Sequence, residues 1–341
     1  MMTAVSGPPA ELHDALAAVL DGFRPAELTR SVQRLIRRYR EGTPPGDVIL
    51  DSELDAAAYA GYRMPATFAA ASAALRQVAA AMPGFAPRTQ VDVGGGTGAA
   101  VWAAARVWPS LERVTVLEQA RHAIALGERL ARRSASPAVR AARWTRTVIR
   151  TEVVKPAADL VTMAYVLGEL PAEALPGVVR SVAADAGLVV LIEPGTPAGY
   201  ARIAAARELL IAQGLSVVAP CPHDRPCAIP PGRDWCHFSA RLGRSALHRR
   251  LKGGELGFED EKFSYVAVSP RRWSPAAGRV VRHPITRKGL VALQVCTGEG
   301  LVQENVTKRQ GERYRQAREA AWGDEWPPRP HSTATIRRNV T

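Results

Sequence analysis

The chain has 341 residues, enough to bury a large core in one elaborated domain or in two. Hydrophobic residues make up 47% of the sequence and charged residues 23%, a balance that excludes global disorder. No uncharged apolar run reaches the roughly 18 residues that a membrane span requires. Glu11 and Asp14 lie where a secretory signal would be apolar, so we expect a cytoplasmic protein with no membrane partner.

The charge balance is strongly basic. Lys and Arg number 45 against 32 Asp and Glu, which gives a formal net charge of +13 and a pI of about 10.2. This excess indicates a polyanionic partner, because Lys and Arg displace condensed counterions from phosphates. We expect RNA and not DNA, and the alternative is a solvated basic surface on an Arg-rich protein.

The N-terminal part of the sequence reads as helical. Apolar residues recur there at spacings of three and four, the period of an amphipathic helix. Pro65 fits the first turn of the last of these helices. The expected helices are Glu11–Asp21, Ala26–Arg40, Ser52–Tyr62 and Ala66–Ala81.

From residue 87 onward, short apolar strands alternate with helices. The expected strands are Val91–Val93, Arg113–Leu117, Asp159–Ala164 and Gly187–Ile192, with helices at Ala99–Val107, Gln119–Arg133 and Ala198–Gln213. The alternation predicts an α/β fold with a parallel sheet, in which ligands bind at the carboxyl ends of the strands. Phe263–Val268 and Leu290–Cys296 are expected to close the same sheet.

A glycine-dense turn joins the first of these strands to a helix, in the segment Val91-Asp92-Val93-Gly94-Gly95-Gly96-Thr97-Gly98. Glycine has no Cβ, so the turn can bring backbone N–H groups close to a ligand at the helix N-terminus. A dinucleotide enzyme would show G-x-G-x-x-G, whereas the spacing here favours S-adenosylmethionine (SAM). No lysine follows the glycines, which excludes a P-loop.

Acidic residues complete the expected SAM site. Asp92 at the strand end would orient the turn and meet the cofactor's ammonium group. Glu118 ends the next strand, where a carboxylate can accept both ribose hydroxyls. Tyr165 and Glu169 follow the strand 159–164, where the adenine and the methyl-transfer pocket would lie, or else they only begin a helix. The expected cofactor-binding residues are Asp92, Gly94, Gly95, Gly96, Gly98, Glu118 and Tyr165.

Beyond cofactor binding, the sequence shows no clear motif for the chemical step, and no residue is assigned as a catalytic base. Cys221 and Cys227 each follow a proline, like the nucleophile of cytosine C5 methyltransferases, but they fall too late in the sheet order for that role.

All four cysteines lie in the second half of the chain, at Cys221, Cys227, Cys236 and Cys296, with the spacing C-x5-C-x8-C-x59-C. Disulfides are not expected in a reducing compartment. Zinc sites usually bring ligands in pairs two to four residues apart, and no two cysteines here are so close. A proline-rich loop with three cysteines and one distant ligand favours an iron–sulfur site, with zinc as the alternative. His223 and His237 are expected beside that site or facing RNA, and the alternative is that they are zinc ligands.

A basic segment follows the cysteine-rich loop. It supplies the cations that we expect to contact RNA phosphates, Arg241, Arg244, Arg249, Arg250 and Lys252.

The cysteine segment also carries a family resemblance. Pro220-Cys221-Pro222-His223, Asp234-Trp235-Cys236-His237-Phe238 and Gly257-Phe258-Glu259-Asp260-Glu261-Lys262-Phe263 resemble the Rsm22 family of small-subunit methyltransferase-like proteins. Arg282-His283-Pro284, Cys296-Thr297 and Trp322-Gly323-Asp324 are similar to that family as well, and the likeness runs from about Tyr62 to Asp324.

The resemblance implies a Rossmann-like SAM-dependent methyltransferase fold and association with small-subunit ribosomal RNA during assembly. It also implies a [4Fe-4S] cluster, whose ligands would be the four cysteines. Two functions remain open, methylation of a ribosomal RNA nucleotide and a non-catalytic assembly role in which SAM and the metal site serve the structure. We expect a monomer away from the ribosome.

The expected organisation has five parts. They are an N-terminal helical region (1–86), a SAM-binding Rossmann-like core (87–219), a Cys-rich cluster-binding insertion (220–262), closing strands of the core (263–300) and a basic C-terminal tail (301–341).

Overall fold

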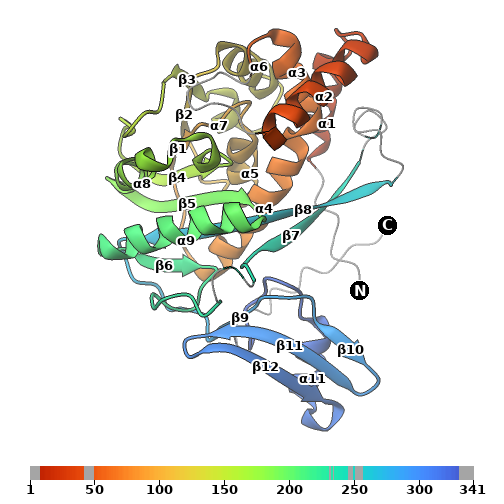
Figure 1. Cartoon of the computed structure of the whole chain (residues 1–341), viewed down its shortest axis with the longest axis vertical. Coiled ribbons are helices and arrows are strands. Elements are labelled where there is room, and N and C mark those ends of the chain that lie inside the picture. Colours follow the sequence, from red (N-terminus) through yellow and green to blue (C-terminus); the bar gives the residue numbers. More distant parts are fainter. Residues whose placement is uncertain are drawn as a thin grey trace.

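The computed structural model describes residues 8–41, 50–229, 232, 234–244, 249 and 256–329. Its main body is an eight-stranded sheet of order β3-β2-β1-β4-β5-β8-β6, in which β7 also pairs with β8 (Figure 1). The strands are β1 Thr89–Val93, β2 Arg113–Glu118, β3 Arg143–Arg146, β4 Ala158–Ala164, β5 Ala186–Pro194, β6 Ser216–Ala219, β7 Phe238–Gly243 and β8 Phe258–Ser269. β1 to β5 are parallel, and β8 runs antiparallel to its neighbours. The predicted α/β, Rossmann-like core is confirmed.

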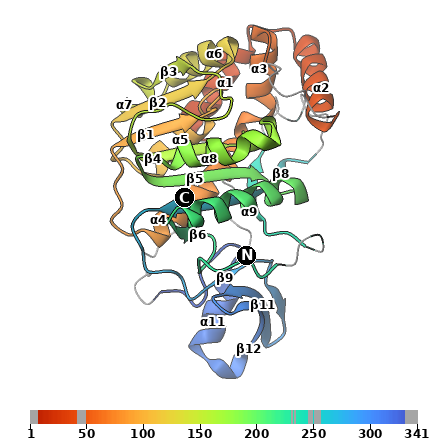
Figure 2. The ribbon, with the colours of Figure 1, turned by 60° about the vertical axis from the view of Figure 1, so that its left-hand side comes forward.

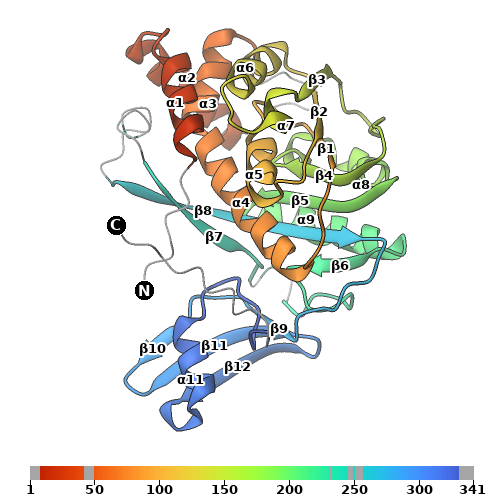
Figure 3. The ribbon, with the colours of Figure 1, turned by 180° about the vertical axis from the view of Figure 1, so that it is seen from behind.

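The central strands are apolar on both faces because helices cover both. On β5, Leu188 and Val190 enter one core cluster, whereas Val189 and Leu191 enter the other. Helices α8 Leu175–Ala183 and α9 Pro197–Ala212 lie over one face (Figure 2). Helices α4 Met64–Ala81 and α5 Ala99–Val107 cross the other face (Figure 3). The main body therefore has three layers, with the sheet between two layers of helices.

The four predicted N-terminal helices are present, and none of their ends is shifted by more than two residues. They are α1 Ala10–Leu20, α2 Pro25–Glu41, α3 Glu53–Tyr62 and α4. Asp55 fastens α3 to α2, because its carboxylate accepts hydrogen bonds from the Ser31 hydroxyl and from Arg34. Two further helices, α6 Arg121–Ala131 and α7 Pro137–Arg140, cover the β2 and β3 side of the sheet.

A second, four-stranded sheet lies at one end of the main body (Figure 1). It contains β9 Gly278–Val280, β10 Ile285–Arg287, β11 Leu290–Thr297 and β12 Gly300–Thr307, followed by η3 Lys308–Gln310 and α11 Glu312–Glu319. Val280, Leu293, Val295 and Trp326 form its separate small core.

Three expectations about the second half of the chain need correction. Leu290–Cys296 does not close the main sheet, because β11 pairs with β9, β10 and β12. The segment 220–262 is not wholly an insertion, since β7 and the first half of β8 belong to the main sheet. Nor is 301–341 simply a tail, because it contains β12 and α11. Gly298 and Glu299 form the short turn between β11 and β12, a hairpin signal that the interpretation missed.

Within the described residues, no helix combines the length and the apolar character that crossing a bilayer would need.

Candidate cofactor pocket and cysteine site

The glycine turn requires glycine for two different reasons. Gly94, Gly96 and Gly98 have φ values of 65°, 53° and 90°, a region that side-chain-bearing residues rarely adopt. A Cβ on Gly95 would lie 2.5 Å from Asp92 Oδ2, so that position has no space for one. A Cβ on Gly96, in contrast, would have no atom within 4 Å. The turn therefore packs tightly against other protein atoms at Gly95, whereas Gly96 faces open space.

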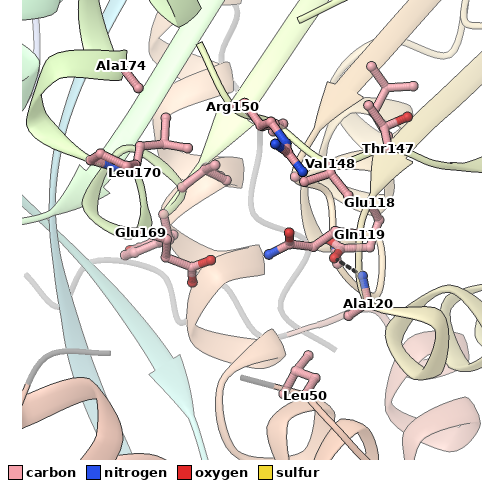
Figure 4. A pocket seen from close by; sticks show the side chains of 18 of the residues that line it. Leu50, Glu118, Gln119, Ala120, Thr147, Val148, Arg150, Glu169, Leu170 and Ala174 are labelled. Atoms are coloured by element: carbon pink, nitrogen blue, oxygen red, sulfur yellow. Dashed lines mark hydrogen bonds between the residues drawn. The ribbon is translucent and has the colours of Figure 1, made fainter. Parts of the chain in front are cut away.

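A cavity of about 420 Å³ lies beside the turn, at the carboxyl ends of β1, β2 and β4. Figure 4 shows the side chains of Glu118, Gln119 and Glu169 directed into the cavity. Leu50 lies across the cavity from Arg150 and Val148 in the same view. This is the place where an open α/β sheet binds ligands. Its lining residues include Leu50, Tyr59, Gly94, Gly96, Glu118, Gln119, Arg150, Tyr165, Glu169 and Glu173.

Glu118 is fixed against the backbone of its own surroundings. Its Oε2 accepts a hydrogen bond from the Gly96 N–H at 2.9 Å, and its Oε1 accepts one from the Ala120 N–H at 2.8 Å. Burial raises the pKa of Glu118, and these N–H groups partly offset the rise. Each carboxylate oxygen still has a lone pair for a further donor. Glu118 is thus held in position to receive hydroxyl groups from a ligand.

Asp92 lies beneath the turn and is absent from the cavity wall. Its Oδ1 accepts a hydrogen bond from the Thr162 hydroxyl at 2.7 Å, and its Oδ2 has no partner among the described residues. Burial, with a smaller contribution from Glu118, raises the pKa of Asp92 to about 7. Gly95 and Gly98 also lie outside the wall, so the cavity brings together Gly94, Gly96, Glu118 and Tyr165 from the predicted set.

Tyr165 connects the cavity with the β7–β8 hairpin. Its φ of 63° is unusual for a residue with a side chain. Its hydroxyl donates to Glu261 Oε1 at 2.8 Å, and Arg63 lies over its ring at 4.6 Å. Arg63 also donates two hydrogen bonds to the Glu261 carboxylate, at 3.1 and 2.8 Å. Tyr165 is therefore held at the same time by Arg63, between α3 and α4, and by Glu261 of β8.

Several wall residues were not predicted from the sequence. Leu50 and Tyr59 come from the N-terminal helical region, and Gln119 and Arg150 follow β2 and β3. A weak signal existed only for Gln119, which directly follows the predicted acid Glu118. The others reach the cavity through the packing of elements distant in sequence.

The fold brings the four cysteines into one region as free thiols. Cys221 and Cys227 lie in the loop after β6, Cys236 precedes β7, and Cys296 lies on β11. Burial raises the pKa of Cys236 well above its usual value, and the nearby thiols of the other three cysteines raise it further. Burial, Cys221 and Cys227 likewise raise the pKa of Cys296 to about 12. All four sulfurs are thus close enough to interact electrostatically.

Buried arginines surround this cysteine site. Arg207 donates to the carbonyl oxygens of His223 and Arg225, both at 2.7 Å, and so fixes the loop between Cys221 and Cys227. Arg279 on β9 donates to Pro220 O at 2.9 Å, which ties the second sheet to the same loop. Both guanidinium groups lower the pKa of the buried Cys221 thiol against the effect of burial.

The cysteine site does not have the geometry of a single-ion centre. Across the residues that the structure describes, no group of three or more His, Cys, Asp or Glu side chains could hold one metal ion. His237 Nδ1 lies 3.1 Å from Trp235 O, and its ring stacks on Trp235 with centroids 5.1 Å apart. His223 Nδ1 lies 3.1 Å from Arg225 O.

The expected RNA-contacting residues lie on and near the β7–β8 hairpin. Arg241 donates two hydrogen bonds of 2.7 Å to Asp260 and lies over the Phe258 ring at 4.3 Å. Arg244 pairs with Glu259 at 2.8 Å, and Arg249 is exposed. Arg250 and Lys252 lie outside the described residues.

Solved structures similar to part of this chain include methyltransferases. The magnesium protoporphyrin IX methyltransferase of Synechocystis PCC 6803 with bound SAM is 12% identical, with a TM-score of 0.40, over 69% of this chain and 91% of that chain. The glycopeptide N-methyltransferase MtfA is 12% identical, with a TM-score of 0.38, over 59% and 90% of the two chains.

Curated relatives are also similar to this chain. The human ribosome assembly protein METTL17, mitochondrial, is 30% identical over 292 residues, which are 79% of this chain and 62% of that protein. The Rsm22-cox11 tandem protein 2, mitochondrial, of Schizosaccharomyces pombe is 28% identical over 193 residues, 43% of this chain and 25% of that protein. The chain thus spans about three fifths of the human protein and a quarter of the tandem protein.

These relatives contradict the predicted cytoplasmic location, because they are mitochondrial proteins. The location prediction was wrong.

The family comparison agrees with the resemblance seen in the cysteine segment. The family described as mitochondrial small ribosomal subunit Rsm22 matches residues 53–327, from the start of α3 to the residue after Trp326. The matched range contains the glycine turn, the cavity wall after Leu50 and all four cysteines. The chain belongs to the Rsm22 family.

Proposed function

We propose that this chain binds SAM in the cavity beside the glycine turn and binds small-subunit ribosomal RNA during ribosome assembly, as a monomer away from the ribosome. The observation that carries the proposal is the 420 Å³ cavity, in which Gly96 and Glu118 meet at the carboxyl ends of the strands. The matched family and the name of the human relative support the ribosomal part.

The residues present fit SAM. Gly96 faces open space, so a ligand can approach the backbone of the turn closely. The fixed carboxylate of Glu118 suits the two ribose hydroxyls, and the rim supplies apolar side chains such as Leu50 and Leu170. When bound, SAM would supply an activated methyl group at a sulfonium centre.

Calorimetric titration with SAM tests the cavity assignment. Gly96→Arg would place a side chain in the cavity and is expected to abolish binding while the protein remains folded, because no protein atom lies within 4 Å of that Cβ. Glu118→Ala is expected to weaken binding about tenfold or more. Binding by Gly96→Arg that equals the wild-type value would contradict the assignment.

Methylation of ribosomal RNA is the first candidate activity, and a non-catalytic assembly role is the second. The second is favoured by Tyr165, whose hydroxyl already donates to Glu261 within the protein. Gly96→Arg separates the two in cells. If subunit assembly continues normally without SAM binding, methyl transfer is dispensable; if methyl transfer from SAM to immature subunit RNA is detected and assembly fails with it, the enzyme is required.

The RNA interface is proposed on the basic hairpin and its surroundings. The net charge of +13 supplies the general attraction, and Arg249 is exposed. Arg241 is already paired with Asp260, so its contribution to phosphate binding requires exchange of that partner. RNA affinity is expected to fall steeply with salt, and Arg249→Ala is expected to reduce the slope of that dependence by about one. A salt-independent affinity would contradict the proposal.

We further propose that the four cysteines hold a [4Fe-4S] cluster, with zinc as the alternative. The support is the grouping of four thiols from three separate segments, with buried cations beside them. Arg207 is 5% exposed, and no carboxylate pairs with it in the described part of the chain. A buried guanidinium is costly without an anion, and cysteine thiolates around a cluster would supply one.

A further inference from the structure

Four charged side chains line the cofactor cavity: Glu118, Arg150, Glu169 and Glu173. Glu118 accepts hydrogen bonds from two backbone N–H groups, and these bonds fix its carboxylate beside the glycine turn. Glu173 is exposed, in the short helix η2 Ala172–Ala174. The neighbouring Glu193 is buried behind the wall and paired with Arg202 at 2.7 Å. Glu169 is exposed as well, and in the described part of the chain neither its carboxylate nor that of Glu173 forms a hydrogen bond or an ion pair. Glu169 is distinguished by its direction, since Figure 4 shows its side chain pointing into the cavity.

The fold aims Glu169 into the cavity. It ends the short helix η1 Leu167–Glu169, directly after β4, and its N–H donates to Val166 O at 2.9 Å. Glu193 fixes the start of the same turn, because it accepts a hydrogen bond from the Leu167 N–H at 3.0 Å. Figure 4 shows the Glu169 carboxylate facing the space between Gln119 and Leu170.

The surroundings of Glu169 disfavour its negative charge when no cation is present. The Glu169 side chain is exposed to the open cavity. Desolvation by the surrounding wall, followed by the carboxylates of Glu118 and Glu193, raises the pKa of Glu169 to about 8. Tyr59 and Tyr165 also line this part of the wall, and their own pKa values are raised, so both are neutral near pH 7. Arg150 is the cation in the described wall, and it lies at the opposite rim beside Val148 (Figure 4).

We propose that Glu169 is a specificity-determining residue that makes the cavity prefer a nucleoside with a positive charge at its sulfur position over the neutral analogue. The inference rests on the proposed SAM binding. A sulfonium or ammonium group near Glu169 would restore the carboxylate charge and gain an ion pair in a partly enclosed space. S-adenosylhomocysteine lacks that charge and gains nothing there.

Three ligands separate the effect of charge from that of the methyl group. They are SAM, sinefungin, which carries an ammonium group in place of the methylsulfonium, and S-adenosylhomocysteine. In wild-type protein the two cations are expected to bind more tightly than S-adenosylhomocysteine. Glu169→Gln is expected to weaken both cations about tenfold and to leave S-adenosylhomocysteine within about twofold. Glu152→Gln removes the same charge at an exposed site outside the wall and is the matched control.

Proton release gives a second readout that does not depend on activity. Titration at pH 7 in buffers of different ionisation enthalpy is expected to show release of a proton when SAM binds, because bound cation lowers the raised pKa of Glu169. Glu169→Gln should release less. An equal loss of affinity for all three ligands, or an unchanged preference, overturns the role of Glu169. If no ligand binds even the wild type, the proposed SAM site fails instead.

Discussion

Two neighbouring strands of one sheet supply the main residues of the cofactor cavity, the glycine turn 94–98 after β1 and Glu118 at the end of β2. The four cysteines come from more distant places, namely the loop after β6, the segment before β7, and β11 of the second sheet. β1 and β2 are neighbours in the main sheet, so strand pairing alone brings the loops that follow them together. The cysteine site instead joins β11 to the loop after β6 across two sheets. The difference predicts that the cysteine site matters more for stability and the glycine turn more for binding.

The largest expected effect is at the cysteine site. If the proposed cluster is present, Cys236→Ser should abolish iron binding and lower the free energy of unfolding by about 4 kcal/mol or more, because metal binding and folding would be coupled. Soluble yield and melting temperature measure the change. Ser239→Ala on β7 is the control, and it should preserve both. Unchanged iron content and melting temperature in Cys236→Ser would show that the loop is peripheral.

The glycine turn provides a matched pair of substitutions. Gly95→Ala should lower the free energy of unfolding by about 3 kcal/mol, because its Cβ would lie 2.5 Å from Asp92 Oδ2 and 2.6 Å from Val116 Cγ1. Gly96→Ala has open space and should cost only about 1 kcal/mol, from its φ of 53°. Urea unfolding measures both. Equal losses would mean that the turn is not closed at Gly95.

Asp92 is expected to make stability depend on pH. Its folded pKa of about 7 lies above the ordinary value of 3.8, so between these values the folded protein binds a proton that the unfolded chain does not. Its contribution to stability therefore falls as pH rises from about 4 to 7. Asp92→Asn should be the more stable protein above pH 7, by on the order of 2 kcal/mol. A difference between the two proteins that is constant across this pH range would exclude an Asp92 origin.

The link between the cavity and the β7–β8 hairpin is expected to give a smaller effect than the substitutions of Gly95 and Asp92. Glu261→Gln would leave the guanidinium of Arg63 without its counter-charge and should cost about 1.5 kcal/mol. It should also weaken SAM binding slightly, because Tyr165 loses a charged hydrogen-bond acceptor. Glu112→Gln breaks a similar pair with Arg88 at an exposed site and should change neither quantity. Loss of the same size in both variants would argue against a special role for Glu261.

The parts of the fold that could be predicted are those whose signal lies in a local sequence pattern. The apolar runs of β1, β2, β4 and β5, the glycine turn and Glu118 all carry their signal within a few residues of sequence. β3 was missed because its residues, such as Arg143 and Arg146, are polar and exposed at the sheet edge. The second sheet was missed because its strands form a small separate core that no periodicity distinguishes from the main one.

The site showed the same division. Leu50, just before α3, and Tyr59, in α3, reach the cavity because α3 packs on α6, the helix that follows β2, and no spacing in the sequence encodes that packing. Asp92 was expected in contact with the ligand, yet the structure has it under Gly95, since the turn folds back over the strand end. The cysteine site was inferred from spacing and resemblance and stays a prediction as a metal centre, whereas the buried Arg207 and Arg279 beside the cysteines became visible only in the structure.

The visible absorption spectrum of protein purified without oxygen, combined with metal analysis, tests the difference between the two regions most directly. The account predicts a brown protein with about four iron and four sulfide per chain, and loss of that absorption in Cys296→Ser. A colourless protein that carries one zinc per chain would contradict it.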